Sequence, residues 1–243
     1  MARQKTRSLG LIVSLLLFPV TIYYLSPVLI INAGLEGIIN GSFIVFASLF
    51  FSGVFFGRLF CAYICPAGGL QECVSHINDK APKQGRRNLI KYMIWSAMIA
   101  ATIISFVLKG RVLGIDFFYQ TDHGISVSNI YAYIIYYGIV LLILLPSLIA
   151  GKRSFCHYLC WMAPFIIFGD KLGGALRLPG LVISLESTKC VSCKRCNSVC
   201  SMSVAPMATT KNGYVNSAEC IKCSACVDAC PQKALRCVIE RRG

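Results

Sequence analysis

Four long stretches of the chain contain no Asp, Glu, Lys, Arg or His, and they dominate its hydrophobic pattern. They are Ser8–Leu35, Gly37–Gly57, Tyr92–Leu108 and Gly124–Gly151. A membrane-spanning helix needs about 20 mostly apolar residues, with a range of about 17 to 25. All four stretches reach that length, and the buried helices of a single soluble domain would not explain so many. The pattern therefore predicts four transmembrane helices.

The first stretch follows three basic residues, Arg3, Lys5 and Arg7, as the apolar region of a signal peptide would. Its uncharged run is longer than the roughly 7 to 15 residues of a cleaved apolar region. We therefore interpret it as an anchor helix. Pro19 and Pro27 are predicted to kink it, since transmembrane helices tolerate proline.

The basic residues predict the orientation of these helices. The chain has 24 Lys and Arg against 10 Asp and Glu, a formal net charge of +14. Of the 24, 22 lie in the N-terminal segment, in the link between the second and third helices, or after the fourth helix. This asymmetry predicts a multi-pass protein of the cytoplasmic (inner) membrane with both termini in the cytoplasm. Because topology explains the basic excess, nucleic acid is not expected as a partner.

Composition also supports a membrane protein, and the cysteine content is a second feature of the chain. Hydrophobic residues make up 56% of the chain and charged residues 14%, whereas an ordinary soluble domain has about 25% charged residues. These values exclude a disordered chain and argue against a water-soluble enzyme. The chain also has 14 cysteines among its 243 residues, and these require an explanation of their own.

Eight of the cysteines form two strings with the spacing C-x2-C-x2-C-x3-C, the bacterial pattern for [4Fe–4S] clusters. In this pattern the fourth cysteine of each string ligates the other cluster. The first cluster is therefore predicted to use Cys190, Cys193, Cys196 and Cys230. The second is predicted to use Cys220, Cys223, Cys226 and Cys200. Zinc sites use separated C-x2-C pairs, and a disulfide framework conflicts with a reducing cytoplasm.

Four more cysteines form a duplicated motif at the ends of the second and fourth predicted helices. In both places a basic residue and an aromatic residue precede C-x-Y-φ-C, where φ is apolar, and the two copies lie 95 residues apart. The copies contain Cys61, Cys65, Cys156 and Cys160, all on the cytoplasmic side by the charge count. If the repeats face each other, these thiolates are placed to hold a third iron–sulfur cluster at the membrane edge. Two alternatives stay open: small residues that let helices approach closely, and a thiol–disulfide site.

With these motifs in place, residues 190–235 resemble a bacterial two-cluster ferredoxin domain, with Ser201 where proline usually follows the first string. Nearly the whole chain resembles polytopic polyferredoxin-like membrane proteins. These include the membrane ferredoxin-type quinol dehydrogenase subunit of periplasmic nitrate reductase systems and the electron-transfer domain of the nitrous oxide reductase regulator. Trp161 departs from the family motif, which often has proline there. The resemblance implies electron transfer between membrane quinone or flavin partners and redox enzymes.

Few other residues suggest chemistry. His157 lies between two candidate ligands, but interfacial packing is the favoured interpretation, and His76 is expected in a solvated loop. Cys73 and Cys237 fall outside the motifs and are expected to be buried structural thiols, which is common for free cysteine. The chain has no phosphate-binding loop, dinucleotide fingerprint or nucleophile elbow. No catalytic residue is therefore assigned.

Together these observations predict an α-helical membrane protein with a small α+β bacterial-type ferredoxin domain. Residues 1–180 are expected to form four transmembrane helices as two helical-hairpin repeats, each ending in C-x3-C. Residues 181–243 are expected to form a cytoplasmic domain with two [4Fe–4S] clusters.

The expected function is relay of single electrons between a ferredoxin, flavoprotein or quinol and a redox partner complex. The chain would serve as an electron-carrier subunit of a hetero-oligomeric oxidoreductase rather than as a stand-alone enzyme. The alternatives are an assembly factor that reduces a metal ion and an iron–sulfur redox sensor.

Overall fold

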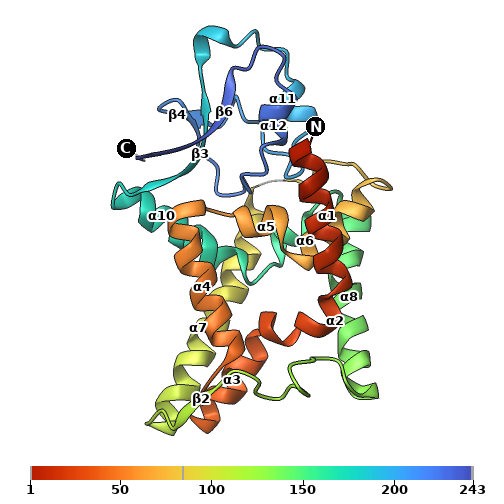
Figure 1. The fold of residues 1–243 in the computed structure, drawn as a ribbon, viewed down its shortest axis with the longest axis vertical. Helices are drawn as coiled ribbons and strands as arrows, with labels where there is room; N and C mark the ends of the chain where they lie inside the picture. The colour runs from red at the N-terminus through yellow and green to blue at the C-terminus, as the bar shows by residue number, and fades with distance from the viewer. Residues whose placement is uncertain (1, 84, 242–243) are drawn as a thin grey trace.

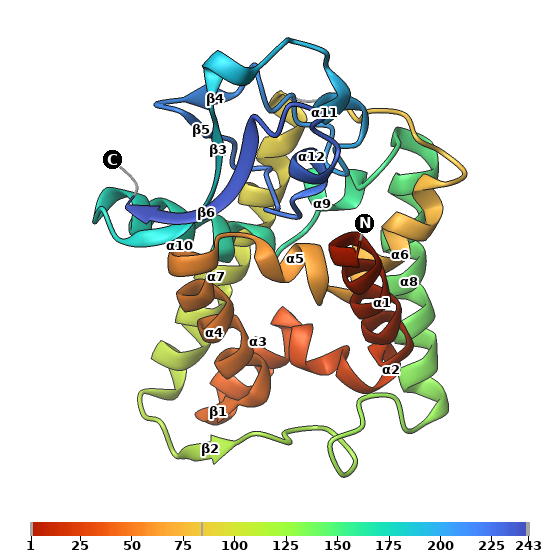
Figure 2. The ribbon, with the colours of Figure 1, turned by 45° about the horizontal axis from the view of Figure 1, so that its top comes forward.

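The computed structural model of the chain describes residues 2–83 and 85–241. Figure 1 shows long helices in the lower part of the molecule and a smaller, strand-containing part above them. The first described turn of α1 and the last strand both lie in the upper part. Short helices occupy the level between the two parts (Figure 2).

The first apolar stretch forms separate short helices, so the prediction of one kinked helix is wrong. The segments are α1 (Ala2–Leu16), α2 (Phe18–Thr21), the 3-10 helix η1 (Tyr23–Leu25) and α3 (Pro27–Glu36). Pro19 lies in the first turn of α2, and Pro27 is the first residue of α3. Proline lacks a backbone N–H and clashes with the preceding turn, but a helix tolerates it in its first turn. Each proline therefore helps to begin a new helix.

The next elements carry the first copy of the cysteine motif. They are β1 (Ile38–Asn40), α4 (Gly41–Phe56), α5 (Leu59–Tyr63) and α6 (Pro66–Ser75). The Asn40 side chain caps α4 by accepting a hydrogen bond from the backbone N–H of Phe43 at 3.0 Å. Gly57 ends α4 with a φ of 56°, which turns the chain sharply into α5.

The second copy follows two longer helices. The elements are η2 (Arg86–Leu89), α7 (Ile90–Lys109), β2 (Gly114–Asp116), α8 (Ile130–Ala150), α9 (Ser154–Tyr158) and α10 (Ala163–Ala175). Two helical segments, Arg86–Lys109 and Ile130–Ala150, are long and apolar enough to cross a membrane, with mean hydropathies of 1.7 and 2.3. Helices α3 and α4 are apolar but shorter, with 10 and 16 residues. The structure thus provides two candidate spans, and four spans remain a prediction.

The two copies of the motif adopt the same local structure. Helices α5 and α9 each have five residues and lie at the end of a long apolar helix, in equivalent positions of the two motifs. The helices that follow them exchange partners, because α10 packs on α4 while α6 packs on α8 and α1. This exchange interlocks the two copies and brings both C-x3-C segments to the same level of the molecule.

The upper part is built on a four-stranded sheet of order β4-β5-β3-β6. Its elements are β3 (Pro179–Leu185), η3 (Ser187–Lys189), α11 (Arg195–Ser198), β4 (Thr210–Lys211), β5 (Tyr214–Val215), α12 (Ala225–Asp228) and β6 (Leu235–Arg241). Strands β3 and β6 are antiparallel, in a register that runs from Pro179 opposite Arg241 to Leu185 opposite Leu235. Asn212 and Gly213 form the turn between β4 and β5, both with positive φ, as two-residue hairpins favour.

Candidate metal centres

The structure gathers the eight cysteines of the two strings around two separate cavities. One cavity is lined by Cys190, Cys193, Cys196 and Cys230, and the other by Cys200, Cys220, Cys223 and Cys226. The fourth cysteine of each string therefore lies with the first three of the other. This placement agrees with the crossed ligand sets that the spacing predicts.

The backbone conformation repeats along the two strings. Ser192 and Lys194 of the first string have positive φ, and so do Lys222 and Ser224, which occupy the equivalent positions of the second string. A left-handed residue among right-handed ones turns successive N–H groups inward and forms the concave anion sites found at iron–sulfur clusters. Both strings thus have a backbone suited to a negatively charged cluster.

Each cavity offers four thiols as its donor set, which is the ligand set of a [4Fe–4S] cluster. Within the described ranges, no group of three or more His, Cys, Asp or Glu side chains is arranged to hold one metal ion. Burial, together with the nearby Cys223 and Cys220, raises the pKa of Cys200 to about 11. Iron ligation would supply the positive charge that such thiolates need.

The crossed ligand sets predict which cysteine substitutions remove which cluster. We expect Cys230→Ser and Cys200→Ser each to lose about four irons, one cluster's worth. The double variant Cys230→Ser/Cys193→Ser should lose no more than Cys230→Ser alone, because both residues line one cavity. Cys230→Ser/Cys223→Ser should lose both clusters. Iron and sulfide determination on anaerobically purified protein measures this, and the reverse pattern would show that each string holds its own cluster.

The remaining four motif cysteines come together at the junction between the long helices and the upper part. We call Cys61, Cys65, Cys156 and Cys160 the membrane-edge quartet. All four are buried, each at most 5% exposed. Burial, together with the neighbouring Cys156 and Cys61, raises the pKa of Cys160 to about 12. Burial and its three partners likewise hold the pKa of Cys65 well above its usual value. All four side chains belong to one buried hydrophobic cluster.

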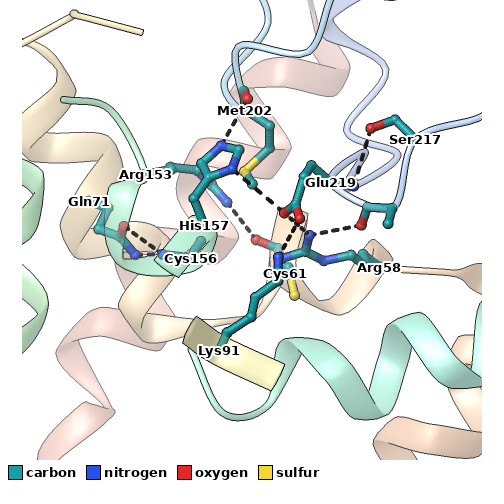
Figure 3. Close-up of polar contacts among 11 residues, drawn as sticks. Arg58, Cys61, Gln71, Lys91, Arg153, Cys156, His157, Met202, Ser217 and Glu219 are labelled. Atoms are coloured by element: carbon teal, nitrogen blue, oxygen red, sulfur yellow. Dashed lines mark hydrogen bonds and ion pairs between the residues drawn. The ribbon is translucent and has the colours of Figure 1, made fainter. Parts of the chain in front are cut away.

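A buried glutamine links the quartet to the helices around it. The Gln71 side chain, on α6, donates from Nε2 to the Cys156 sulfur at 3.1 Å. Its Oε1 accepts from the backbone N–H of Cys156 at 3.3 Å and from the Ser147 hydroxyl, on α8, at 3.2 Å. Figure 3 shows this side chain turned toward Cys156. Gln71 thus holds α9 against α6 and α8 and fixes one candidate ligand.

Two fully buried arginines lie beside the quartet, each three residues before the first cysteine of its motif. Arg153 donates to the carbonyl oxygen of Cys61 at 3.0 Å and to Glu72 at 2.8 Å. Arg58 donates to the carbonyl oxygen of Ala218 at 3.1 Å and to Glu219 at 3.0 Å. Three further guanidinium nitrogens have no hydrogen-bond partner among the described residues: Nε and one terminal nitrogen of Arg58, and Nε of Arg153. Unpaired buried donors are costly, so these groups are suited to an additional acceptor.

Glu219 connects the upper part to this junction. Its carboxylate accepts from Arg58 and from the ammonium of Lys91. Burial alone would raise the pKa of Glu219, but Arg58 and Lys91 outweigh burial and hold it below the usual value. Glu219 directly precedes Cys220, so this ion pair ties the second ferredoxin cavity to the segment that carries Cys61 (Figure 3).

His157 packs in the same junction. It is completely buried, and its Nε2 lies 3.0 Å from the carbonyl oxygen of Met202, which lines the second cavity. Burial lowers the pKa of His157 to about 4, so the ring is neutral at pH 7. Its Nδ1 lies 3.7 Å from Glu219, and the neutral ring makes no ion pair there. The structure thus gives His157 the packing role that the sequence favours.

Several groups at the junction are not predictable from the sequence. Gln71, Lys91 and Glu219 lie in separate segments, and no spacing rule connects them. The basic residue before each motif is duplicated, but the distribution of Lys and Arg predicts only membrane topology. The expectation of a buried Cys73 is wrong: the thiol is exposed, because α6 buries the face that carries Gln71 and Val74. Cys237 is half-buried, and His76 is exposed as expected.

Comparison with known proteins supports the iron–sulfur chemistry. Residues 39–84 and 134–179 each match a family described as a 4Fe-4S binding domain, and residues 189–235 match the 4Fe-4S dicluster domain. Each of the first two segments contains one C-x3-C pair, so a site with four cysteines needs the pairs of both segments. The third segment contains all eight cysteines of the two strings.

The chain is also similar to longer proteins, two of which have names that indicate electron transport or a ferredoxin. The protein MJ0750 of Methanocaldococcus jannaschii is 28% identical over 74% of this chain and 71% of its own length. YccM of Escherichia coli, named as a putative electron transport protein, is 24% identical over 72% of this chain and 49% of its own length. The ferredoxin-type protein NapH of Haemophilus influenzae is 22% identical over 76% of this chain and 64% of its own length. The chain thus spans from about half to about seven tenths of these relatives. No solved structure matches it.

Proposed function

Because the chain is a polyferredoxin-like protein with 4Fe-4S binding domains, we propose that it relays single electrons at the cytoplasmic membrane. It would connect a ferredoxin, flavoprotein or quinol with a redox partner complex. Iron–sulfur clusters supply this chemistry when bound, and the protein sets their potentials through charge, hydrogen bonds and exposure. The chain then provides ligands, insulation and docking surfaces.

Three ligand sets are part of the proposal. Cys190, Cys193, Cys196 and Cys230 hold the first [4Fe–4S] cluster, and Cys200, Cys220, Cys223 and Cys226 hold the second. The membrane-edge quartet holds a third iron–sulfur centre. Two repeats that each match a 4Fe-4S binding domain favour this third centre.

The observation that carries the proposal is the direct packing of the quartet against the second ferredoxin cavity. The quartet and Cys223 belong to one buried hydrophobic cluster, and Cys200 packs on it. Met202 lines the second cavity and accepts from His157, next to Cys156. The two sites thus share one buried apolar cluster and are linked by the contact between His157 and Met202. A relay requires such closely spaced, water-excluded centres.

The membrane arrangement rests on pattern and layout. Four passes would use α1 to α3 together as the first, then α4, α7 and α8. The parallel pairing of β1 with β2 joins the ends of these passes far from the ferredoxin part (Figure 1). The described start of α1 contacts the ferredoxin part through Arg3 and Asp228. Both termini would then be cytoplasmic, in agreement with the distribution of Lys and Arg.

The decisive test is the cluster content of the anaerobically purified chain. About eight irons would mean two [4Fe–4S] clusters and would exclude the third centre, whereas about ten to twelve would support it. Cys61→Ser and Cys156→Ser should each remove only the additional iron and its EPR signal. Cys73→Ser is the matched control, because Cys73 is exposed and lies outside the quartet. Zinc bound at the quartet would also contradict the third centre.

Coupling to partners separates the relay from its alternatives. Reduction of the clusters by quinol or reduced flavodoxin in liposomes, followed by reoxidation by an acceptor protein, would support a relay. A metal-ion-reducing assembly factor would reduce metal ions without quinone coupling. A redox sensor would change partner binding without steady electron flow.

A further inference from the structure

The surroundings of the membrane-edge quartet carry an excess of buried positive charge. Arg7, Arg58, Lys91 and Arg153 are buried. They pair with only two carboxylates, Glu72 and Glu219. Four cations against two carboxylates leave an excess of two positive charges among these described residues.

Buried charge without a counter-charge is strongly unfavourable. Guanidinium groups cannot relieve it by losing a proton, because arginine stays charged in proteins. An anionic group at the quartet would balance it, and a metal centre held by four thiolates is anionic as a whole.

The two arginines are placed symmetrically for this purpose. Arg58 and Arg153 occupy equivalent positions, 95 residues apart, in the duplicated motif. Figure 3 shows their side chains approaching Cys61 from opposite sides. The guanidinium nitrogens without partners belong to these same two residues. Both arginines are anchored by a carboxylate, Glu219 for Arg58 and Glu72 for Arg153.

We propose that Arg58 and Arg153 are positioning residues of the membrane-edge iron–sulfur centre, whose charge they balance and whose reduction potential they raise. The inference rests on the proposed third centre. Net charge and hydrogen bonds to sulfur are among the main determinants of cluster potential. A buried cation favours the reduced, more negative state. The negative charge of Glu219 lowers the reduction potential of the membrane-edge centre. Because Glu219 lies next to Cys220, it also lowers the potential of the second ferredoxin cluster.

Potentiometric titration followed by EPR tests this inference. Arg58→Gln and Arg153→Gln should shift the potential of the membrane-edge centre to more negative values. Arg58→Lys and Arg153→Lys keep the charge and should shift it much less. Glu219→Gln removes a negative charge and should shift it in the positive direction. A purely structural role would not produce shifts of opposite sign in intact centres.

Iron retention provides a second measurement that does not depend on electron transfer. Loss of groups that support metal ligands typically lowers metal affinity by about 10- to 100-fold. Arg58→Gln and Arg153→Gln should therefore release the additional iron to a chelator faster than the wild-type chain. The iron content of the ferredoxin strings should stay unchanged.

The outcomes distinguish the two proposals. If the wild-type chain shows only two clusters, the proposed third centre fails. If the third centre is present and the glutamine variants leave its potential and its iron retention unchanged, the inference about the arginines is wrong. Equal shifts for the lysine and glutamine variants would also overturn it, because charge would then not be the cause.

Discussion

Replacing Glu219 with alanine is expected to destabilise the protein by about 3–5 kcal/mol, the usual cost of removing one partner from a buried ion pair. The carboxylate accepts from Arg58 and Lys91, which are both almost completely buried. Without it, two cations would face each other with no counter-charge. The loss would act at the junction between the ferredoxin part and the helices, because Glu219 is on one side and its partners are on the other.

The same ion pair predicts an acid sensitivity with a definite sign. Arg58 and Lys91 hold the pKa of Glu219 below its ordinary value against the opposing effect of burial. A carboxylate with a lowered folded-state pKa contributes stability above its unfolded pKa, and this stability is lost as the pH falls through the folded pKa. Acidification below about pH 4 should therefore weaken the junction. Glu219→Ala should remove this component of the pH dependence.

Thermal or denaturant unfolding in detergent measures the stability of these variants. Glu219→Gln should cost less than Glu219→Ala, because the amide oxygen can still accept a hydrogen bond. Glu240→Ala is the matched control: this carboxylate is exposed and its partner is Tyr214, so its removal should change stability by less than about 1 kcal/mol. Equal losses for Glu219→Ala and Glu240→Ala would show that the buried pair contributes little.

Local spacing was enough to predict the ferredoxin cavities. The first three cysteines of each string are close in sequence and line one cavity, and the structure places the fourth cysteines, Cys200 and Cys230, in the crossed positions. The duplication of the C-x3-C motif also predicted that its four cysteines face each other, and all four are buried in one hydrophobic cluster. The metal centre they would share stays a prediction. In both cases a repeated short motif encodes the arrangement.

The junction could not be predicted in the same way. Arg58 meets Glu219 across 161 positions of sequence, and this contact depends on how the two parts pack. From the sequence, Arg58 and Arg153 count among the basic residues that indicate membrane topology, because a sequence does not show that a basic residue is buried. The prediction of one kinked helix for the first apolar stretch was wrong for a different reason. Composition indicates the length of an apolar stretch, but it does not show that Pro19 and Pro27 begin new helices.

The close packing of α10 on α4 leads to the second large effect, expected for Gly169→Ala. A methyl group added at Gly169 would lie 2.2 Å from the carbonyl oxygen of Phe50 on α4. The contact is reciprocal, since a methyl group at Gly53 would lie 2.6 Å from the carbonyl oxygen of Ile166 on α10. Both obstacles are backbone atoms, which cannot move away as a side chain can. Two glycines thus let the helix backbones approach each other.

Gly169→Ala should therefore force α10 away from α4 and cost about 1–3 kcal/mol, as overpacking usually does. Gly174→Ala is the control on the same helix, because nothing lies within 4 Å of the added methyl group. That variant should be neutral or stabilise the protein by up to about 1 kcal/mol, since alanine favours helix more than glycine does. Unfolding of both variants in detergent would compare the two effects. If Gly169→Ala matched Gly174→Ala, the close approach of the two helices would not matter for stability. Because α10 begins three residues after Cys160, a displaced α10 should also weaken iron retention at the membrane-edge quartet.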